Sequence, residues 1–207
     1  MKGVTVIQHP LAQARLMEMR DAQTDTATFR RALGQLGLLL LQEATRALPV
    51  KSKRVRTPLA VTSMTVPTRP VLLVPILRAG QGLVSLAEQI VPGATHGYLG
   101  MARNESTLQP EIYLDKLPPR LGRFEIFVCD PMLATGGSAI AAGQLLLKRG
   151  AKQLRFVHAL AAPEGVRALR QAIPEASIFT ASMDECLNEN GYIVPGLGDA
   201  GDRCFGC

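Results

Sequence analysis

The sequence has no tryptophan, and aromatic residues make up only 4% of its 207 residues. Proteins that bind single-stranded RNA or DNA usually interleave stacking aromatic side chains with basic ones. The formal net charge of +6 therefore favours a small phosphorylated ligand over nucleic acid. No segment reaches membrane-spanning length, and the start lacks an apolar stretch long enough for a signal peptide. We expect a cytoplasmic protein with neither a nucleic acid nor a membrane as its partner.

Cysteine is also scarce, with four residues in the whole chain, which is too few for a disulfide scaffold. Cys129 and Cys186 stand beside apolar residues, as small core side chains do. Cys204 and Cys207 form a C-x-x-C pair, but no second close pair of cysteine or histidine completes a four-ligand zinc site. We expect reduced thiols and no metal held directly by the protein.

Two common nucleotide-binding patterns are missing. The sequence contains no Gly-x4-Gly-Lys-[Ser/Thr], and no Gly-x-Gly-x-x-Gly follows its first strand-like segment. Nucleotide hydrolysis and hydride transfer both lose support from these absences.

Short apolar runs alternate with helix-like segments through the middle of the chain. We expect strands at residues 71–77, 124–129 and 154–160, and helices at residues 82–91, 138–148 and 164–172. Such alternation is typical of a parallel sheet with crossover helices, and uninterrupted apolar runs fit strands that are covered on both faces. Ligands of such folds bind at the carboxyl ends of the strands.

The length and apolar content predict a single domain over residues 1–207. Its expected parts are a helical segment at 1–50, a core at 71–182 and a ligand-binding tail at 183–207. Residues 29–48 carry one apolar stripe of a helix that Pro49 ends, and it should pack on the sheet or on a second subunit.

Three segments depart from this regular alternation. The basic residues 51–56 are interpreted as a solvated turn rather than as a site for an anionic effector. Residues 103–120 and 188–207 look irregular, and long irregular stretches inside compact domains are often lids or binding loops.

The strongest local motif is residues 127–138, an apolar strand that leads through a glycine turn to the start of a helix. Gly136 and Gly137 let the backbone curl, so that amide groups and the positive end of the helix dipole can face a phosphate. Asp130 at the end of the strand can accept hydrogen bonds from ribose hydroxyls. A tight turn with a solvated Asp130 is an equally good interpretation of this motif taken alone.

Residues 127–138 resemble the motif by which type I phosphoribosyltransferases bind 5-phosphoribosyl pyrophosphate (PRPP). Residues 75–80, 100–105 and 187–203 look like uracil phosphoribosyltransferases, and the last stretch is the most specific. The resemblance runs from Val4 to Gly206. It implies a parallel sheet flanked by helices, with N-terminal helices and an irregular C-terminal hood over the base, and it implies the conversion of uracil and PRPP to UMP and pyrophosphate in pyrimidine salvage.

The resemblance also implies roles for particular residues. Arg78 and Arg103 would contact the pyrophosphate end of PRPP, which suits the fixed donors of guanidinium. Together with Asp130 and Asp199 they form the expected catalytic set. The 5-phosphate and ribose would be held by Asp130, Pro131, Met132, Leu133, Ala134, Thr135, Gly136, Gly137 and Ser138, with Asp199 also near PRPP. Uracil would meet Ile193, Gly198, Asp199 and Ala200.

The partners that the resemblance implies are Mg²⁺ bound with PRPP, a second copy of the chain in a homodimer or larger homo-oligomer, and GTP as an allosteric effector in some members. Main-chain groups among glycines can match the two carbonyls and the N–H of uracil, whereas cytosine would leave one group mismatched.

The chain departs from the family pattern at several positions. Pro131 and Ala134 replace acids that many relatives carry in the turn, so we expect no carboxylate base there and hypothesise that uracil is bound in a deprotonated or enolic form. Ala102 stands where an aromatic residue is common, and Cys204 and Cys207 also replace the usual residues.

Two other interpretations compete with this one. The first is an RNA-binding regulator built on the same fold, and the second is an enzyme for cytosine or a purine. Histidine catalysis is not expected, because His9, His96 and His158 lie outside the recognised motifs, and His158 is interpreted as a strand residue.

Overall fold

The computed structural model describes residues 3–103 and 110–207, without the side chains of Arg103 and Pro110. Its centre is a nine-stranded sheet whose main path has the order β1-β11-β10-β8-β4-β6-β7. Neighbours along this path run parallel, except β6 and β7. The strands are β1 (Val4–Val6), β4 (Val71–Leu77), β5 (Thr95–His96), β6 (Tyr98–Arg103), β7 (Pro110–Lys116), β8 (Glu125–Cys129), β9 (Met132–Leu133), β10 (Leu154–Ala161) and β11 (Ser177–Met183).

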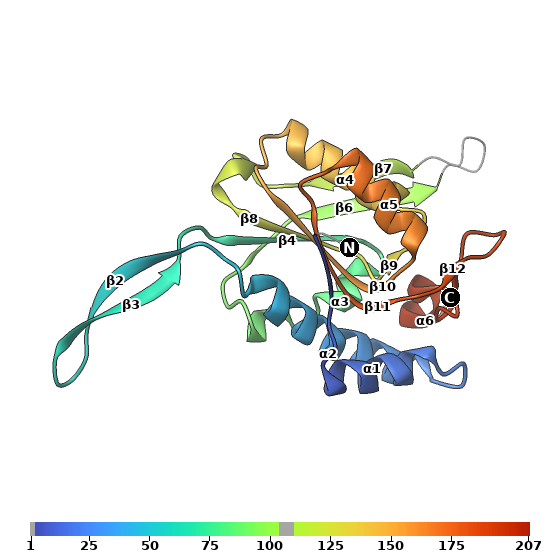
Figure 1. Ribbon diagram of the computed structural model, residues 1–207, viewed down its shortest axis with the longest axis horizontal. Helices are drawn as coiled ribbons and strands as arrows, with labels where there is room; N and C mark the ends of the chain where they lie inside the picture. Colours follow the sequence, from blue (N-terminus) through green and yellow to red (C-terminus); the bar gives the residue numbers. More distant parts are fainter. Residues whose placement is uncertain (1–2, 104–109) are drawn as a thin grey trace.

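Helices cover both faces of this sheet (Figure 1). Helices α1 (Pro10–Arg20) and α2 (Thr26–Thr45) cover one face, and α4 (Gly137–Lys148) and α5 (Pro163–Ala172) cover the other. Successive strand residues alternate between the two cores, as Phe156 and Val157 of β10 do. The expected strands covered on both faces are therefore confirmed.

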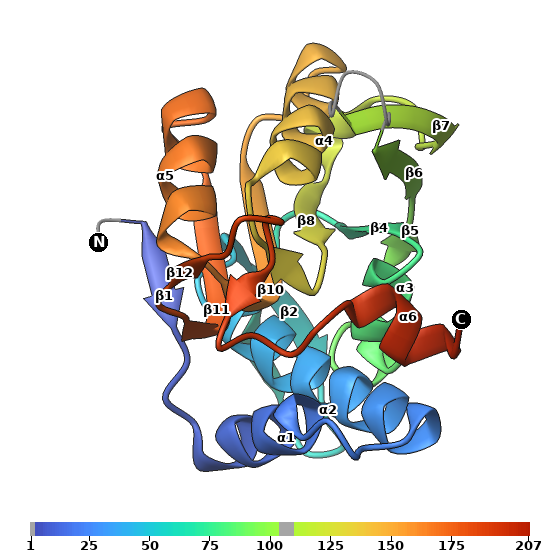
Figure 2. The same cartoon turned by 90° about the vertical axis from the view of Figure 1, so that its right-hand side faces the viewer.

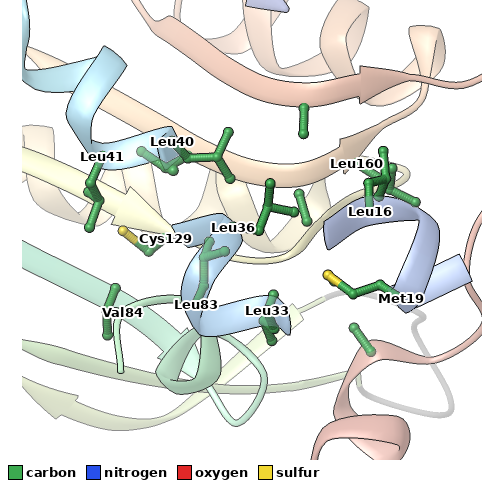
Figure 3. Close-up of a cluster of buried hydrophobic side chains, with 14 of the residues drawn as sticks. Leu16, Met19, Leu33, Leu36, Leu40, Leu41, Leu83, Val84, Cys129 and Leu160 are labelled. Carbon is green, nitrogen blue, oxygen red and sulfur yellow. The ribbon is translucent and has the colours of Figure 1, made fainter. Parts of the chain in front are cut away.

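Helix α2 carries the apolar stripe expected in the N-terminal part. The Asp25 side chain caps the helix by accepting a hydrogen bond of 2.8 Å from the Thr28 amide. Figure 3 shows leucines of α2 beside Leu16 and Met19 of α1 in one cluster with Cys129 and Leu160 of the sheet. The sequence left two positions open for the N-terminal helices, on the sheet or on a second subunit. In the structure they pack on the sheet.

The basic segment 51–56 was wrongly interpreted as a turn. It is strand β2 (Val50–Arg56), paired antiparallel with β3 (Val61–Pro67) in a hairpin that projects away from the body (Figure 1). The partner strand is rich in valine and threonine, which favours pairing. The Thr57 hydroxyl accepts hydrogen bonds from the Leu59 and Ala60 amides and so stabilises the connecting turn. The positive charge of the segment does not by itself distinguish an exposed strand from an exposed turn.

The prediction of a continuous helix over residues 82–91 is also wrong, because the helical structure there is much shorter. The structure has a single turn, α3 (Gly80–Leu83), followed by a 3-10 turn, η1 (Ala87–Gln89). Gly80 and Gly82 occupy this short helix, and glycine is a poor helix former. A second 3-10 turn, η2 (Leu121–Arg123), precedes β8.

Two segments expected to be irregular contain regular structure. Strand β7 lies within 103–120, where pairing with β6 overrides the polar composition; residues 104–109 of that expected lid lie outside the described residues. The tail contains β13 (Ile193–Val194), which pairs with β12 (Cys186–Leu187), and helix α6 (Ala200–Phe205). Cys129 is buried as expected, but Cys186 is exposed, because the neighbouring Leu187 is the residue of β12 that packs against the core. No helix among the described residues is long and apolar enough to cross a membrane.

Helix α2 closely approaches α3 and the residues after it at two glycines. A Cβ at Gly37 would lie 1.8 Å from the Leu83 carbonyl oxygen, which is backbone, whereas a Cβ at Gly34 would meet the movable Ser85 hydroxyl at 2.5 Å. We expect Gly37→Ala to lower the free energy of unfolding by about 1–3 kcal/mol through overpacking. The control Gly34→Ala should cost much less, because Ser85 can rotate and alanine favours helix. Urea unfolding measures both, and equal costs would contradict the close-approach explanation.

Candidate active site

A cavity of about 390 Å³ lies where the turn after β8 faces β6 and the C-terminal tail. Three segments of the chain line this cavity. Figure 2 shows the tail, with β12 and α6, in front of the sheet. Predicted site residues on its wall are Met132, Ala134, Thr135, Gly137, Ser138, Ile193, Gly198, Asp199 and Ala200. The cavity thus brings the predicted phosphate turn and the predicted base-binding tail into one site.

The predicted phosphate turn, residues 130–138, has the expected strand, turn and helix structure. Gly136 has a φ of 87°, which an L side chain rarely adopts, and it directly precedes α4. Helix α4 therefore begins at Gly137, beside the cavity, with its free amide groups and its positive dipole end at the turn. Pro131, Leu133 and Gly136 of the predicted set are buried behind the wall.

Gly165 of α5 packs directly against this turn, and it was not predicted from the sequence as a residue of the site. A Cβ at Gly165 would lie 2.3 Å from the Ala134 carbonyl oxygen and 2.7 Å from that of Leu133. Only glycine therefore lets the start of α5 touch the turn. A glycine directly after Pro163-Glu164 at the start of an amphipathic helix was the available signal, but its partner is about 30 residues away in the sequence.

Asp130 is partly buried and lies beneath the turn rather than on the cavity wall. Its amide donates to the Val157 carbonyl at 3.1 Å. Burial raises the pKa of the Asp130 carboxyl to about 7; a backbone hydrogen bond at Met132 opposes this, and the nearby Asp199 carboxylate adds to it. The Asp199 carboxylate is therefore close enough to Asp130 to disfavour its ionisation.

Asp199 lines the cavity and also begins helix α6. Its Oδ1 accepts a hydrogen bond of 2.9 Å from the Asp202 amide. Gly198 before it has a φ of 80°, and Gly196 has a φ of 63° with no room for a Cβ, which would lie 2.0 Å from the Ile193 carbonyl oxygen. These glycines bring bare main chain to the cavity, as the base-binding hypothesis requires.

The tail is held in place by an ion pair to helix α1. Arg20 donates to both carboxylate oxygens of Asp184, at 2.8 and 2.5 Å, and to the Gly196 carbonyl at 2.7 Å. Asp184 in turn accepts the Gly196 amide at 2.9 Å. Burial opposes ionisation of Asp184, but the bonds from Arg20, Ser182 and Gly196 lower the pKa of its carboxyl below the usual value. Arg20 and Asp184 were not foreseen as site residues.

Two more arginines fasten the end of the tail to the N-terminal helices. Arg203 donates to the Leu197 carbonyl at 2.9 Å, to that of Asp21 at 2.5 Å, and to that of Met19. Arg30 donates twice to the Cys204 carbonyl, at 3.0 and 2.9 Å. The C-terminal tail, residues 183–207, which is the predicted hood over the base, is therefore held in place by residues from the other end of the chain.

Of the two predicted pyrophosphate arginines, Arg78 does not line the cavity. Arg78 directly follows β4, and its side chain is exposed beside α6, with one nitrogen 3.2 Å from Cys207 Sγ and another 3.8 Å from an Asp202 oxygen. Arg103 ends β6 opposite Pro110, and its side chain lies outside the described part of the chain.

Several lining residues were not on the predicted list. Met101 and Ala102 of β6 and residues 190–192 of the hood complete the wall. Ala102, expected to alter the packing near Arg103, thus opens onto the cavity. Within residues 3–103 and 110–207, no group of three or more histidine, cysteine or acidic side chains could hold a metal ion, Cys204 and Cys207 included.

Solved structures share this fold. The AQ2163 protein from Aquifex aeolicus matches with a TM-score of 0.92 and 38% identity over 98% of this chain and 97% of that one. A purine phosphoribosyltransferase from Pyrococcus horikoshii matches with a TM-score of 0.50 and 12% identity over 73% of this chain and 82% of that one, a likeness of fold alone. The parallel sheet and the phosphate turn define the class as a type I phosphoribosyltransferase.

Sequence comparison identifies the family within this class. The family model for uracil phosphoribosyltransferase matches residues 6–207. Uracil phosphoribosyltransferases from Streptococcus pneumoniae and Levilactobacillus brevis are 49% and 48% identical over 100% and 97% of this chain, and over 99% and 97% of their own lengths. The chain belongs to the uracil phosphoribosyltransferase family.

The hood anchor leads to a stability prediction. Arg20→Ala leaves the Asp184 carboxylate buried without its cation, so we expect the free energy of unfolding at pH 7 to fall by about 2–4 kcal/mol. Because the pKa of Asp184 is lowered in the folded protein, this contribution is present above the ordinary aspartate pKa and lost as the pH falls below it. The control Arg15→Ala removes a more exposed pair with Glu18 on the same helix and should cost at most about 1 kcal/mol. Urea unfolding at pH 7 and pH 3 measures both, and an equal effect of the two variants at pH 7 would refute the anchor.

Proposed function

We propose that this protein transfers the phosphoribosyl group of PRPP to uracil and so makes UMP and pyrophosphate for pyrimidine salvage. One observation carries the proposal: a single cavity is lined both by the turn at the start of α4 and by the glycine-containing hood. Family membership over residues 6–207 supports the same conclusion.

The turn would bind the ribose phosphate half of PRPP. Thr135 and Ser138 offer hydroxyl donors beside the amide groups at the start of α4, a combination that suits the 5-phosphate. Asp130 would accept hydrogen bonds from the ribose hydroxyls. Arg78 and Arg103 would meet the pyrophosphate end, and the exposed guanidinium of Arg78 would exchange its contacts with Cys207 and Asp202 for the ligand.

The hood would bind uracil through its main chain at Ile193, Gly198 and Ala200, with Asp199 close to both substrates. Uracil has two carbonyl acceptors and an N–H between them, and bare backbone can meet all three. In the transfer, the proton of the base nitrogen passes to solvent and the nitrogen bonds to the anomeric carbon, while the pyrophosphate oxygen leaves with the electron pair of the broken bond. No acid stands at Pro131 or Ala134, so we propose that the hood selects a deprotonated or enolic form of uracil.

Mg²⁺ would enter as a complex with PRPP. The described residues offer no group of three or more metal-ligating side chains of the histidine, cysteine and acidic types, but Asp130 and Asp199 provide carboxylates beside the cavity. When bound, the ion neutralises charge on the departing pyrophosphate.

We further propose that the protein forms a homodimer or a larger homo-oligomer. The β2-β3 hairpin projects from the body (Figure 1) and exposes Val50, Val55, Leu59, Val61 and Met64. An isolated two-stranded hairpin is marginally stable in water, so a second copy of the chain is the natural partner for this arm. Regulation by GTP stays a prediction.

The substrate prediction is tested by pyrophosphate release from Mg²⁺-PRPP with uracil, cytosine, hypoxanthine and adenine offered separately. We expect release with uracil and at least about 100-fold lower kcat/KM with cytosine, because one buried hydrogen-bonding group is then unmatched. Release with a purine alone would refute the proposed substrate. Silence with every base, together with an RNA gel shift at stated salt, would favour the RNA-binding regulator.

The raised pKa of Asp130 predicts a pH dependence for PRPP binding. Only the carboxylate accepts hydrogen bonds at both oxygens, so the affinity of the free enzyme for PRPP should fall as the pH drops through about 7. Asp130→Asn should bind more weakly above pH 7 and lack this step. The variant also corrects for protonation of PRPP itself, which is common to both proteins. Calorimetric titrations between pH 5.5 and 8.5 measure the difference, and parallel pH curves would contradict the assignment.

A further inference from the structure

His158 is a buried titratable side chain for which the proposed reaction has no use. It lies in the middle of β10, and none of its surface is exposed. Its ring stacks on that of Phe156, with 6.3 Å between the ring centroids and 10° between their planes. The imidazole therefore occupies one fixed position in the core between the sheet and helices α4 and α5.

One nitrogen of this ring contacts the first residue of the phosphate turn. Nδ1 lies 2.7 Å from the Asp130 carbonyl oxygen. A carbonyl only accepts hydrogen bonds, so Nδ1 must carry the proton and donate it. Nε2 is then a bare acceptor, and it is buried with no hydrogen-bond partner in the described part of the chain. Burial lowers the pKa of His158 to about 4, against the opposing effect of the Asp130 bond, and so the ring is neutral near pH 7.

The other contacts of this segment come from the backbone of β10. The Asp130 amide donates to Val157, and the Ala159 and Leu160 amides donate to the Pro131 carbonyl at 2.9 and 3.0 Å. The carbonyl of Asp130 is held by the His158 side chain instead of by a ladder bond. This side chain thus sets the orientation of the peptide between Asp130 and Pro131.

We propose that His158 is a positioning residue, which fixes the Asp130 end of the turn for the ribose phosphate of PRPP by donating from Nδ1 to the Asp130 carbonyl. The proposal rests on the proposed function only in naming PRPP as the ligand. It predicts that losing the donor weakens PRPP binding and leaves base recognition by the hood largely unchanged.

Asparagine and leucine provide a matched pair at this position. They have nearly the same shape, but the asparagine amide can place a donor where Nδ1 stands. We expect His158→Leu to raise the Kd for Mg²⁺-PRPP about tenfold, measured by calorimetry, with the KM for uracil within about twofold of wild type. His158→Asn should bind PRPP within about threefold of wild type. Equal weakening in both variants, or wild-type binding in His158→Leu, overturns the proposal.

Thr180→Val controls for the loss of any buried polar group. Thr180 is also fully buried and pairs with His158 across β10 and β11, and its hydroxyl lies 2.9 Å from the Ser182 carbonyl and 3.3 Å from the Ala159 carbonyl, rather than at the Asp130 carbonyl. We expect its PRPP affinity to stay at the wild-type level, and weakening equal to that of His158→Leu overturns the positioning role.

The tautomer of His158 gives a test that needs no variant to fold. Nitrogen-15 NMR of the unliganded wild-type protein at pH 7 should show a neutral ring protonated at Nδ1, and protonation at Nε2 overturns the proposal. These measurements concern the turn and PRPP alone. If no base releases pyrophosphate, the proposed function fails, while the leucine and asparagine comparison still decides the role of His158.

Discussion

The ion pair between Arg20 and Asp184 determines whether the two ends of the chain can build one cavity. Asp184 follows the last strand of the sheet, and its carboxylate fixes the Gly196 amide of the hood while Arg20 fixes the Gly196 carbonyl. Both charges are substantially removed from water, so each is tolerated only while the other is in place. Without this pair, the main chain at Gly196 would lose the contacts that join it to α1 and to the end of β11.

A carboxyl group beside the cavity, that of Asp130, is ionised only at an electrostatic cost. Burial raises the energy of the charged form of Asp130, and the nearby Asp199 carboxylate adds to this penalty. Because the pKa of Asp130 is raised in the folded state, its ionisation destabilises the empty enzyme as the pH rises from about 4 to about 7. Ribose hydroxyls and a divalent cation would relieve that penalty. A carboxyl group whose ionisation is unfavourable without a ligand is thus well suited to a ligand that brings hydrogen-bond donors and positive charge.

The elements that could be predicted from the sequence are those whose causes are local. The strand at residues 71–77 and the turn at 130–138 follow from apolar runs, glycines and a helix start that lie side by side in the chain. Gly165, His158 and Arg20 were missed because their partners are 28 to 176 residues away, and no local pattern records such a contact. Uracil as the substrate was predicted by resemblance, since bare main chain has no distinctive composition.

The two halves of the site therefore differ in how they are stabilised. The predicted phosphate half consists of nine consecutive residues, 130–138, which run from the end of β8 into the first turn of α4. The base half depends on bonds between residues 174 to 184 positions apart, made by Arg30 and Arg203 to exposed or partly buried main chain. Local unfolding should start where buried apolar contacts are fewest, which favours the hood over the sheet. The predicted base-binding half is then expected to be the less stable part of the site.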